Sequence, residues 1–243
     1  MSVPDDADES TATAVAVVAL GPGPLADITT GDGAQLVADL EALIDSAPRA
    51  LLLDARGGAG CREPRPPTPS GLHDPAAILA RFPAPTIAVW DGPAIGAGAE
   101  VLLAADVRVI GPGATLQLPE VEQGELPCWG GTQRLTRVAG VALALRAIVL
   151  GDELGAEELE RSGAAIRVDD PVGHAEALAA RLAAGAPRAQ AAARDAVQRG
   201  RDLTIAEGHR VEADLNLLLS TTVDRAEGID AFFAKRPPNF RGE

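Results

Sequence analysis

The sequence predicts an α/β fold in which helices cover a parallel sheet, followed by a segment made almost only of helices. Apolar β-branched runs alternate with helical patterns in the N-terminal half, whereas the C-terminal half shows helical periodicity nearly throughout. The chain has 243 residues, of which 47% are hydrophobic, so one large core is available. Because aromatic residues make up only 2%, this core consists mainly of closely packed Ala, Val and Leu.

The first predicted unit is a strand, a helix and a second strand. The β-branched run "TAVAVVAL" at 13–20 ends at "GPGP", which is typical of a buried strand followed by a turn. A helix is expected at 33–47 and a second buried strand at 49–56. The expected buried face of that helix carries Leu36, Leu40, Leu43 and Ile44. This order implies parallel strands joined by a right-handed crossover.

The next segment combines a long loop with a short helix and a strand. Residues 57–71, "GGAGCREPRPPTPSG", are dense in Pro and Gly, and such long irregular segments are often binding loops. A helix is predicted at 73–82, with Asp74 as its N-cap and Pro75 at its first position. The run "PTIAVWDG" at 85–92 predicts a third strand.

A glycine turn at the start of 96–108 leads into a predicted buried helix, and short strands follow at "VRVIG" and "ATLQLPE". Further helices are expected at 131–151, 155–165, 173–185, 187–200, 204–222 and 224–236, with one short strand at "IRV".

The charge and the cysteine content exclude several classes of protein. The net charge is −14, and no basic face for nucleic acid is evident. No window of about 18 uncharged apolar residues predicts a transmembrane helix. Residues 1–11 are polar and acidic, unlike a signal peptide, so we expect a disordered tail and a cytoplasmic protein. Cys61 and Cys128 form no disulfide framework, and the three scattered histidines indicate no metal site.

The glycine turn "DGPAIGAGAE" is the first candidate for chemistry. It follows a strand and precedes a helix, whose first N–H groups lack intrahelical acceptors and could hold an oxyanion. A tight packing turn without a ligand is the alternative. Glu100 falls in the first turn of that helix, and Glu120 follows a Pro at a strand end. The two carboxylates are either an acid/base pair in a pocket or ordinary solvated side chains.

Two stretches resemble the enoyl-CoA hydratase/isomerase family, the crotonases. "PTIAVWDGPAIGAGAEVLLAADVRV" is similar to the family's P-x-I-A-x-x-x-G-x-x-x-G-G-G-x-E-L-x-x-x-C-D. "LQLPEVEQGELPCWGGTQRLTRVAG" is similar to its F-x-x-P-E-x-x-x-G-x-x-P-G-x-G-G-T-Q-R-L-x-R-x-x-G. The resemblance implies a crotonase-like spiral of ββα units over 12–185, with a C-terminal helical trimerisation region over 186–243. It further implies a homotrimer or a dimer of trimers, an acyl-CoA thioester substrate and no separate cofactor.

The resemblance also implies the roles of site residues. Glu100 and Glu120 match the two glutamates that flank the water in hydratases, so hydration of a trans-2-enoyl-CoA, or the reverse dehydration, is expected. Ala97 would donate one oxyanion N–H, with Gly96 beside the substrate. The second donor position falls on Pro64, which has no N–H, although a small shift would place Glu63 or Arg62 there.

Further departures keep other functions open. Cys128 stands where the family has a glycine that contacts the water, and it is either a small buried hydrophobe or a reactive thiol. Trp129 either narrows the acyl pocket or fills the core. Arg62, together with Arg56 and Arg65, either binds CoA phosphates or belongs to a solvated loop. Another crotonase chemistry (isomerisation, decarboxylation or a biosynthetic dehydration) and a non-catalytic partner subunit are the alternatives to a hydratase.

Overall fold

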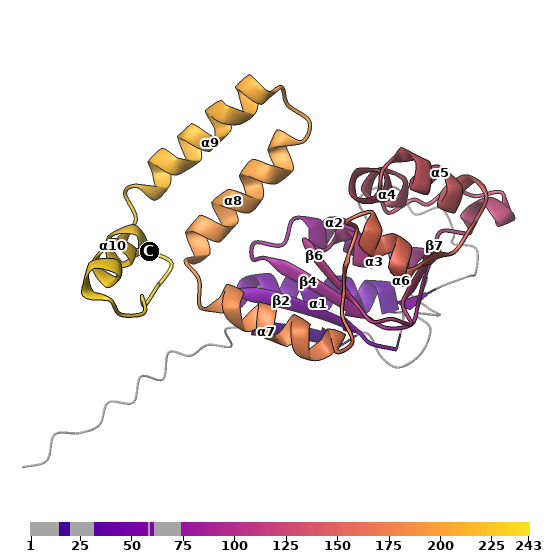
Figure 1. Ribbon diagram of the computed structural model, residues 1–243, viewed down its shortest axis with the longest axis horizontal. Helices are drawn as coiled ribbons and strands as arrows, with labels where there is room; N and C mark the ends of the chain where they lie inside the picture. Colours follow the sequence, from indigo (N-terminus) through magenta and orange to yellow (C-terminus); the bar gives the residue numbers. More distant parts are fainter. Residues whose placement is uncertain (1–14, 20–31, 58, 61–73) are drawn as a thin grey trace, which may run out of the picture.

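The computed structural model describes residues 15–19, 32–57, 59–60 and 74–243 (Figure 1). Five parallel strands form the larger sheet, in the order β1-β2-β4-β6-β9. These strands are β1 (Val15–Ala19), β2 (Ala50–Ala55), β4 (Thr86–Trp90), β6 (Val107–Ile110) and β9 (Ile166–Arg167). The predicted α/β fold with a parallel sheet is therefore confirmed.

A second, smaller sheet has the order β3-β5-β7-β8, in which only the β7–β8 pair is antiparallel. Its strands are β3 (Ala59–Gly60), β5 (Pro93–Ile95), β7 (Thr115–Gln117) and β8 (Leu154–Gly155). Strands β3, β5 and β8 are not predicted from the sequence, because two or three residues are too few to show alternation.

The chain alternates between the two sheets, which produces the spiral. A strand of the larger sheet is followed by one of the smaller sheet and then by a helical element. The successive turns are β2–β3–α2, β4–β5–α3 and β6–β7–η1, where α2 is Pro75–Ala80, α3 is Ala97–Ala104 and η1 is the 3₁₀ turn Glu120–Gln123. In the second and third turns, α3 and η1 follow closely on β5 and β7, which are neighbouring parallel strands of the smaller sheet.

The larger sheet is buried on both faces, as parallel sheets usually are. On β2, Leu51 and Leu53 face the main core, whereas Leu52 faces a second cluster packed under α7 (Pro171–Ala183). Helices α1 (Asp32–Asp45), α2 and α3 contribute to the main core on the opposite face (Figure 1).

The buried face predicted for α1 is correct except near the C-terminal end of the helix. Leu36 and Leu40 are buried and Leu43 is partly buried, but Ile44 is 37% exposed. Val37 is buried instead. Helix α1 ends at Asp45, so Ile44 lies in its last turn.

Helix α2 begins as the sequence predicts. The Asp74 carboxylate accepts a hydrogen bond of 2.9 Å from the N–H of Ala77, and Pro75 occupies the first helical position. The carboxylate satisfies a backbone donor that has no partner within the helix.

The predicted single helix over 131–151 is wrong, because two helices occupy this segment. They are α4 (Gly131–Ala139) and α5 (Val141–Val149), separated by Gly140 with a φ of 84°. This φ breaks the helix at one residue, while the apolar spacing continues across the break and conceals it in the sequence.

The predicted helices after residue 155 are confirmed as α6 (Ala156–Arg161), α7, α8 (Pro187–Gly200), α9 (Ile205–Leu219) and α10 (Val223–Ala234). Figure 1 shows α8 and α9 as a hairpin that extends away from the sheets, with α10 and the C-terminus near its open end. The domain boundary at residue 185 stays a prediction. Within the described ranges no helix has the length and apolarity required to span a bilayer.

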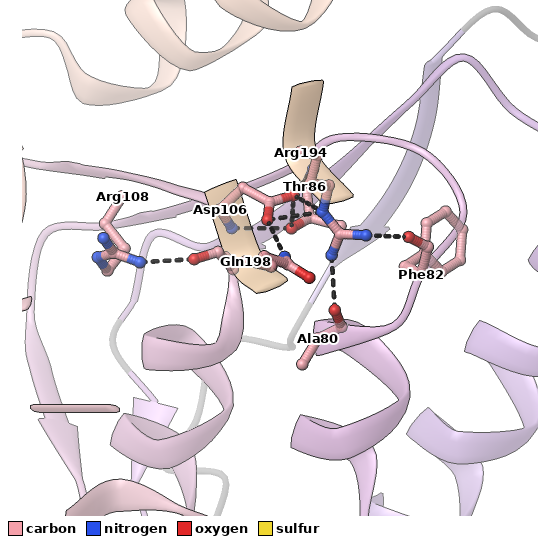
Figure 2. Close-up of polar contacts among 8 residues, drawn as sticks. Ala80, Phe82, Thr86, Asp106, Arg108, Arg194 and Gln198 are labelled. Carbon is pink, nitrogen blue, oxygen red and sulfur yellow. Dashed lines mark hydrogen bonds and ion pairs between the residues drawn. The ribbon is translucent and has the colours of Figure 1, made fainter. Parts of the chain in front are cut away.

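A partly buried ion pair attaches α8 to the spiral (Figure 2). The Nε of Arg194 donates to both carboxylate oxygens of Asp106 at 2.7 Å. Its two Nη atoms donate to the carbonyls of Phe82 and Ala80 at 2.6 and 2.7 Å. Asp106 also accepts from the N–H and hydroxyl of Thr86 at the start of β4. One residue of α8 thus joins three segments of the core.

Candidate active site

The two glutamates follow neighbouring parallel strands of the smaller sheet. Ile95 of β5 pairs with Gln117 of β7, and the N–H of Gly96 donates to the carbonyl of Gln117 at 2.9 Å. Immediately after these strands, Glu100 lies in the first turn of α3 and Glu120 begins η1. Since carboxyl ends of parallel strands share one edge, both side chains leave the sheet at the same edge.

Glu100 is fully buried, with no exposed surface. Its Oε1 accepts hydrogen bonds of 2.8 Å from the N–H groups of Trp129 and Gly131. Hydrogen bonds to a carboxylate are short and stronger than neutral ones. The alternative of a solvated Glu100 is therefore wrong, since the turn before α4 holds one of its oxygens.

The two glycines before α4 provide the space for this contact. A Cβ at Gly131 would lie 2.9 Å from the Cγ and 3.0 Å from the Oε1 of Glu100. Gly130 has a φ of 89°, in the left-handed region that favours glycine. The turn can approach Glu100 closely because Gly131 carries no side chain, while Gly130 permits the backbone conformation of the turn.

Glu120 is also buried, with 8% of its surface exposed. Its carbonyl accepts from the N–H of Glu125 at 3.0 Å, and Gly124 ends the 3₁₀ turn with a φ of 75°. The alternative of a solvated Glu120 is therefore wrong as well. The structure thus describes two buried carboxylates at one sheet edge, and their joint acid/base role stays a prediction.

Ala97 is the first residue of α3 and is 1% exposed. The N–H groups in the first turn of a helix have no acceptor within the helix and carry the positive end of its dipole. The preceding Gly96 has a φ of 54° and a ψ of −123°, a conformation that turns the chain sharply from β5 into α3. This geometry suits an oxyanion donor, and the role of Ala97 stays a prediction.

Comparison with known proteins identifies the group to which these features belong. Residues 70–243 match the enoyl-CoA hydratase/isomerase family. The chain belongs to this family. It is 38% identical over 169 residues to the 2,3-dehydroadipyl-CoA hydratase of Escherichia coli, which covers 68% of this chain and 66% of that protein.

A human relative, the mitochondrial enoyl-CoA hydratase domain-containing protein 2, is 40% identical over 172 residues, covering 68% of this chain and 59% of the relative. The matched segment thus spans less than two thirds of either curated relative. The crystal structure of an enoyl-CoA hydratase subunit I from Geobacillus kaustophilus has a TM-score of 0.82 and 30% identity, with 95% of both chains covered. The crotonase-like fold predicted from the sequence is confirmed.

Cys128 and Trp129 precede Gly130 in the turn that holds Glu100. Cys128 is exposed, so the alternative of a small buried hydrophobe is wrong. Trp129 is 6% exposed and belongs to the main hydrophobic core. Its bulk therefore fills the core beneath the turn. Contacts of Cys128 and Trp129 with a substrate stay predictions.

The predicted second oxyanion donor and most of the arginine cluster lie outside the described residues. This applies to Pro64, Glu63, Arg62 and Arg65. The described member, Arg56, forms an ion pair with Asp54, with Nη2 and Oδ2 2.5 Å apart. Burial raises the pKa of Asp54, but the hydrogen bonds and charge of Arg56 outweigh it and leave this pKa below its ordinary value. Phosphate binding by Arg56 stays a prediction.

No three His, Cys, Asp or Glu side chains gather as metal ligands in the part of the chain that the structure describes.

The contacts of Glu100 with the turn before α4 join residues 29 and 31 positions apart, which sequence patterns do not predict. The paired glycines of "WGGTQR" could have indicated such a close approach.

Proposed function

We propose that this protein adds water across the 2,3 double bond of an enoyl-CoA thioester, or catalyses the reverse dehydration. One observation carries the proposal: Glu100 and Glu120 are both buried and follow adjacent strands at one sheet edge. The E. coli relative named 2,3-dehydroadipyl-CoA hydratase supports the same class of reaction.

The chemistry uses the two carboxylates around one water molecule. The water oxygen bonds to the β-carbon of the enoyl group while a carboxylate accepts one of its protons. The electron pair of the double bond moves toward the thioester, giving an enolate, and a proton is delivered to the α-carbon. Glu100 and Glu120 thus act as acid and base, a role that typically contributes a rate factor of about 10² to 10⁴.

An oxyanion donor stabilises the enolate in this proposal. The N–H of Ala97, in the first turn of α3 at the positive end of the helix dipole, donates to the thioester oxygen in this mechanism, and Gly96 allows close approach. Loss of one such donor typically costs about 3 kcal/mol, roughly a hundredfold in rate. The loop containing Pro64 would supply the second donor.

The experiment that tests the proposal is a hydration assay. Purified protein is incubated with crotonyl-CoA, longer and branched enoyl-CoAs and 2,3-dehydroadipyl-CoA, and loss of the enoyl absorbance is followed. Mass spectrometry should show the gain of one water. Glu120→Gln and Glu100→Gln should each lower kcat by about 10²- to 10⁴-fold, because glutamine cannot exchange the proton.

Glu122→Gln is the matched control, since Glu122 lies on the same 3₁₀ turn as Glu120 but is exposed. It should leave kcat unchanged. A product of unchanged mass would indicate isomerisation instead of hydration. Unchanged absorbance with every thioester, or a Glu120→Gln variant as active as the wild type, would refute the proposal.

We also propose that the protein assembles as a homotrimer or a dimer of trimers. The helices after residue 200 carry large apolar side chains at the surface of the single chain, namely Ile205, Leu217, Leu218, Phe232 and Phe233. Burial of such side chains between subunits is favourable. Light scattering coupled to gel filtration gives the mass directly, and a monomer would contradict this proposal.

We further propose that the reaction needs no separate cofactor and that the protein is cytoplasmic. The proposed reaction needs only the CoA thioester, so activity should survive dialysis against EDTA. The cytoplasmic location stays a prediction, because the human relative is named mitochondrial. Fractionation of cells of the source organism tests it.

A further inference from the structure

Arg134 lies beside the site without belonging to the proposed acid/base pair. It is the fourth residue of α4, and its backbone N–H donates to the carbonyl of Gly130 at 2.8 Å. Its Nη1 donates to the carbonyl of Trp129, and its Nη2 donates to the carbonyl of Ala76 on α2 at 3.3 Å. The guanidinium therefore bridges the turn before α4 and a neighbouring helix.

The turn is shaped around this guanidinium. A Cβ at Gly130 would overlap the Nη1 of Arg134, so the glycine leaves the path of the side chain open. Gly131 leaves the corresponding space for Glu100 on the other side. The two glycines thus serve different partners: one admits the arginine and the other admits the glutamate.

The pKa of Arg134 is affected by both the burial of the guanidinium and the charges of its neighbours. Burial lowers the pKa of Arg134, while the charges of Asp74 and Glu100 raise it. An arginine retains its proton in proteins, so Arg134 is a partly buried cation whose charge interacts with that of Glu100. Because both Nη atoms donate to backbone carbonyls, the cation is fixed in place.

We infer that Arg134 is a positioning residue for Glu100. The Trp129 carbonyl that binds Arg134 is part of the same turn whose N–H groups, at Trp129 and Gly131, hold Glu100 Oε1. By restraining this carbonyl, Arg134 restrains the orientation of the donors and hence of the carboxylate. The inference rests on the proposed function of Glu100 and adds the residue that holds it in its working position.

The kinetic test compares three variants. Arg134→Gln should lower kcat about tenfold to a hundredfold with KM within about twofold, because a displacement of about 1 Å can cost 10²-fold. Arg134→Lys should rescue only part of the loss, since an ammonium lacks the planar fork that reaches two carbonyls. Arg137→Gln, one turn along α4, is the control. Arg137 is exposed and pairs with Asp202 at 3.3 Å, so this variant should match the wild type.

A second measurement needs no turnover. The chain has two tryptophans, so protein labelled with ¹⁵N-tryptophan gives two backbone amide peaks, assigned with a Trp90→Phe variant. Arg134→Gln should shift the Trp129 amide peak and speed its hydrogen exchange. The Trp90 peak should not move, because Trp90 lies on β4 and is fully buried in the core. General loosening of the fold would change both peaks.

The outcomes separate the two proposals. If the wild type hydrates enoyl-CoA while Arg134→Gln keeps full kcat, the positioning role is wrong and the proposed function stands. If the wild type turns over none of the thioesters, the proposed function fails, and the Trp129 amide alone decides whether Arg134 restrains the turn. An unmoved Trp129 peak in Arg134→Gln overturns the inference in either case.

Discussion

Replacement of Arg194 by alanine should markedly destabilise the protein. The side chains of Arg194 and Asp106 are 14% and 20% exposed, so the ion pair is mostly removed from water. The variant leaves Asp106 without its only cationic partner among the hydrogen bonds described, although Thr86 and Gln198 still donate to it. The carbonyls of Ala80 and Phe82 lose donors as well.

The magnitude follows from these contacts. Removal of one partner from a buried ion pair costs about 3 to 5 kcal/mol. Because three donors remain on Asp106 and both side chains keep some solvent contact, we expect the low end, about 3 kcal/mol. For a chain of this length each kcal/mol lowers the melting temperature by about 2 to 4 °C, so the expected shift is roughly 6 to 12 °C.

Urea and thermal unfolding followed by circular dichroism, at matched protein concentration, measure this loss. Arg199→Ala is the matched control, because Arg199 lies on the same helix and forms an exposed pair with Asp195 at 2.9 Å. Exposed pairs contribute only about 0 to 1 kcal/mol, so this variant should resemble the wild type. Equal stability of Arg194→Ala and Arg199→Ala would refute the assignment of Arg194 as the attachment of α8.

Three further predictions concern glycines and one ion pair. Gly131→Ala should displace the carboxylate of Glu100 and lower kcat about tenfold to a hundredfold in the hydration assay. Full activity of this variant would contradict the close contact between Gly131 and Glu100. Gly140→Ala should lower the free energy of unfolding by about 1 to 3 kcal/mol, because its φ of 84° and ψ of 160° lie in a region nearly restricted to glycine. Gly208→Ala, inside α9, should raise the free energy of unfolding by up to about 1 kcal/mol. Urea melts in which both variants change this free energy in the same direction would disprove the assignment. Hydrogen bonds from Arg236 lower the pKa of Glu227 to about 2, below its ordinary 4.5, so the stability from this pair is present above pH 4.5 and is lost as pH falls through about 2. A carboxyl ¹³C titration of Glu227 with an ordinary midpoint would argue against the pair.

Local patterns predicted most of the fold, and the failures have physical causes. The cap at Asp74 and the buried strand β2 depend on neighbours in the sequence, so they were predictable. The smaller sheet was not, because β3, β5 and β8 are defined by pairing with distant strands. The break at Gly140 was hidden because the backbone turns at a single residue while the apolar spacing continues.

For the site, periodicity alone left Glu100 and Glu120 as either buried or solvated, and only the family resemblance favoured a pocket. The burial of both side chains is a tertiary property. The contact between Glu100 and Gly131 spans 31 residues, and no local pattern predicts such a pair. The same reason explains why the sequence did not indicate Arg134.

In the proposed mechanism, the anchoring of Glu100 couples stability to catalysis in an unusual direction. Catalytic groups are commonly kept at the expense of stability, so that removing them makes an enzyme more robust. Here the carboxylate completes the turn before α4, and its removal would take away the acceptor that the buried N–H groups of Trp129 and Gly131 share. Evolution toward another activity on this scaffold would therefore first require a different acceptor at this position, which restricts the mutational routes open to it.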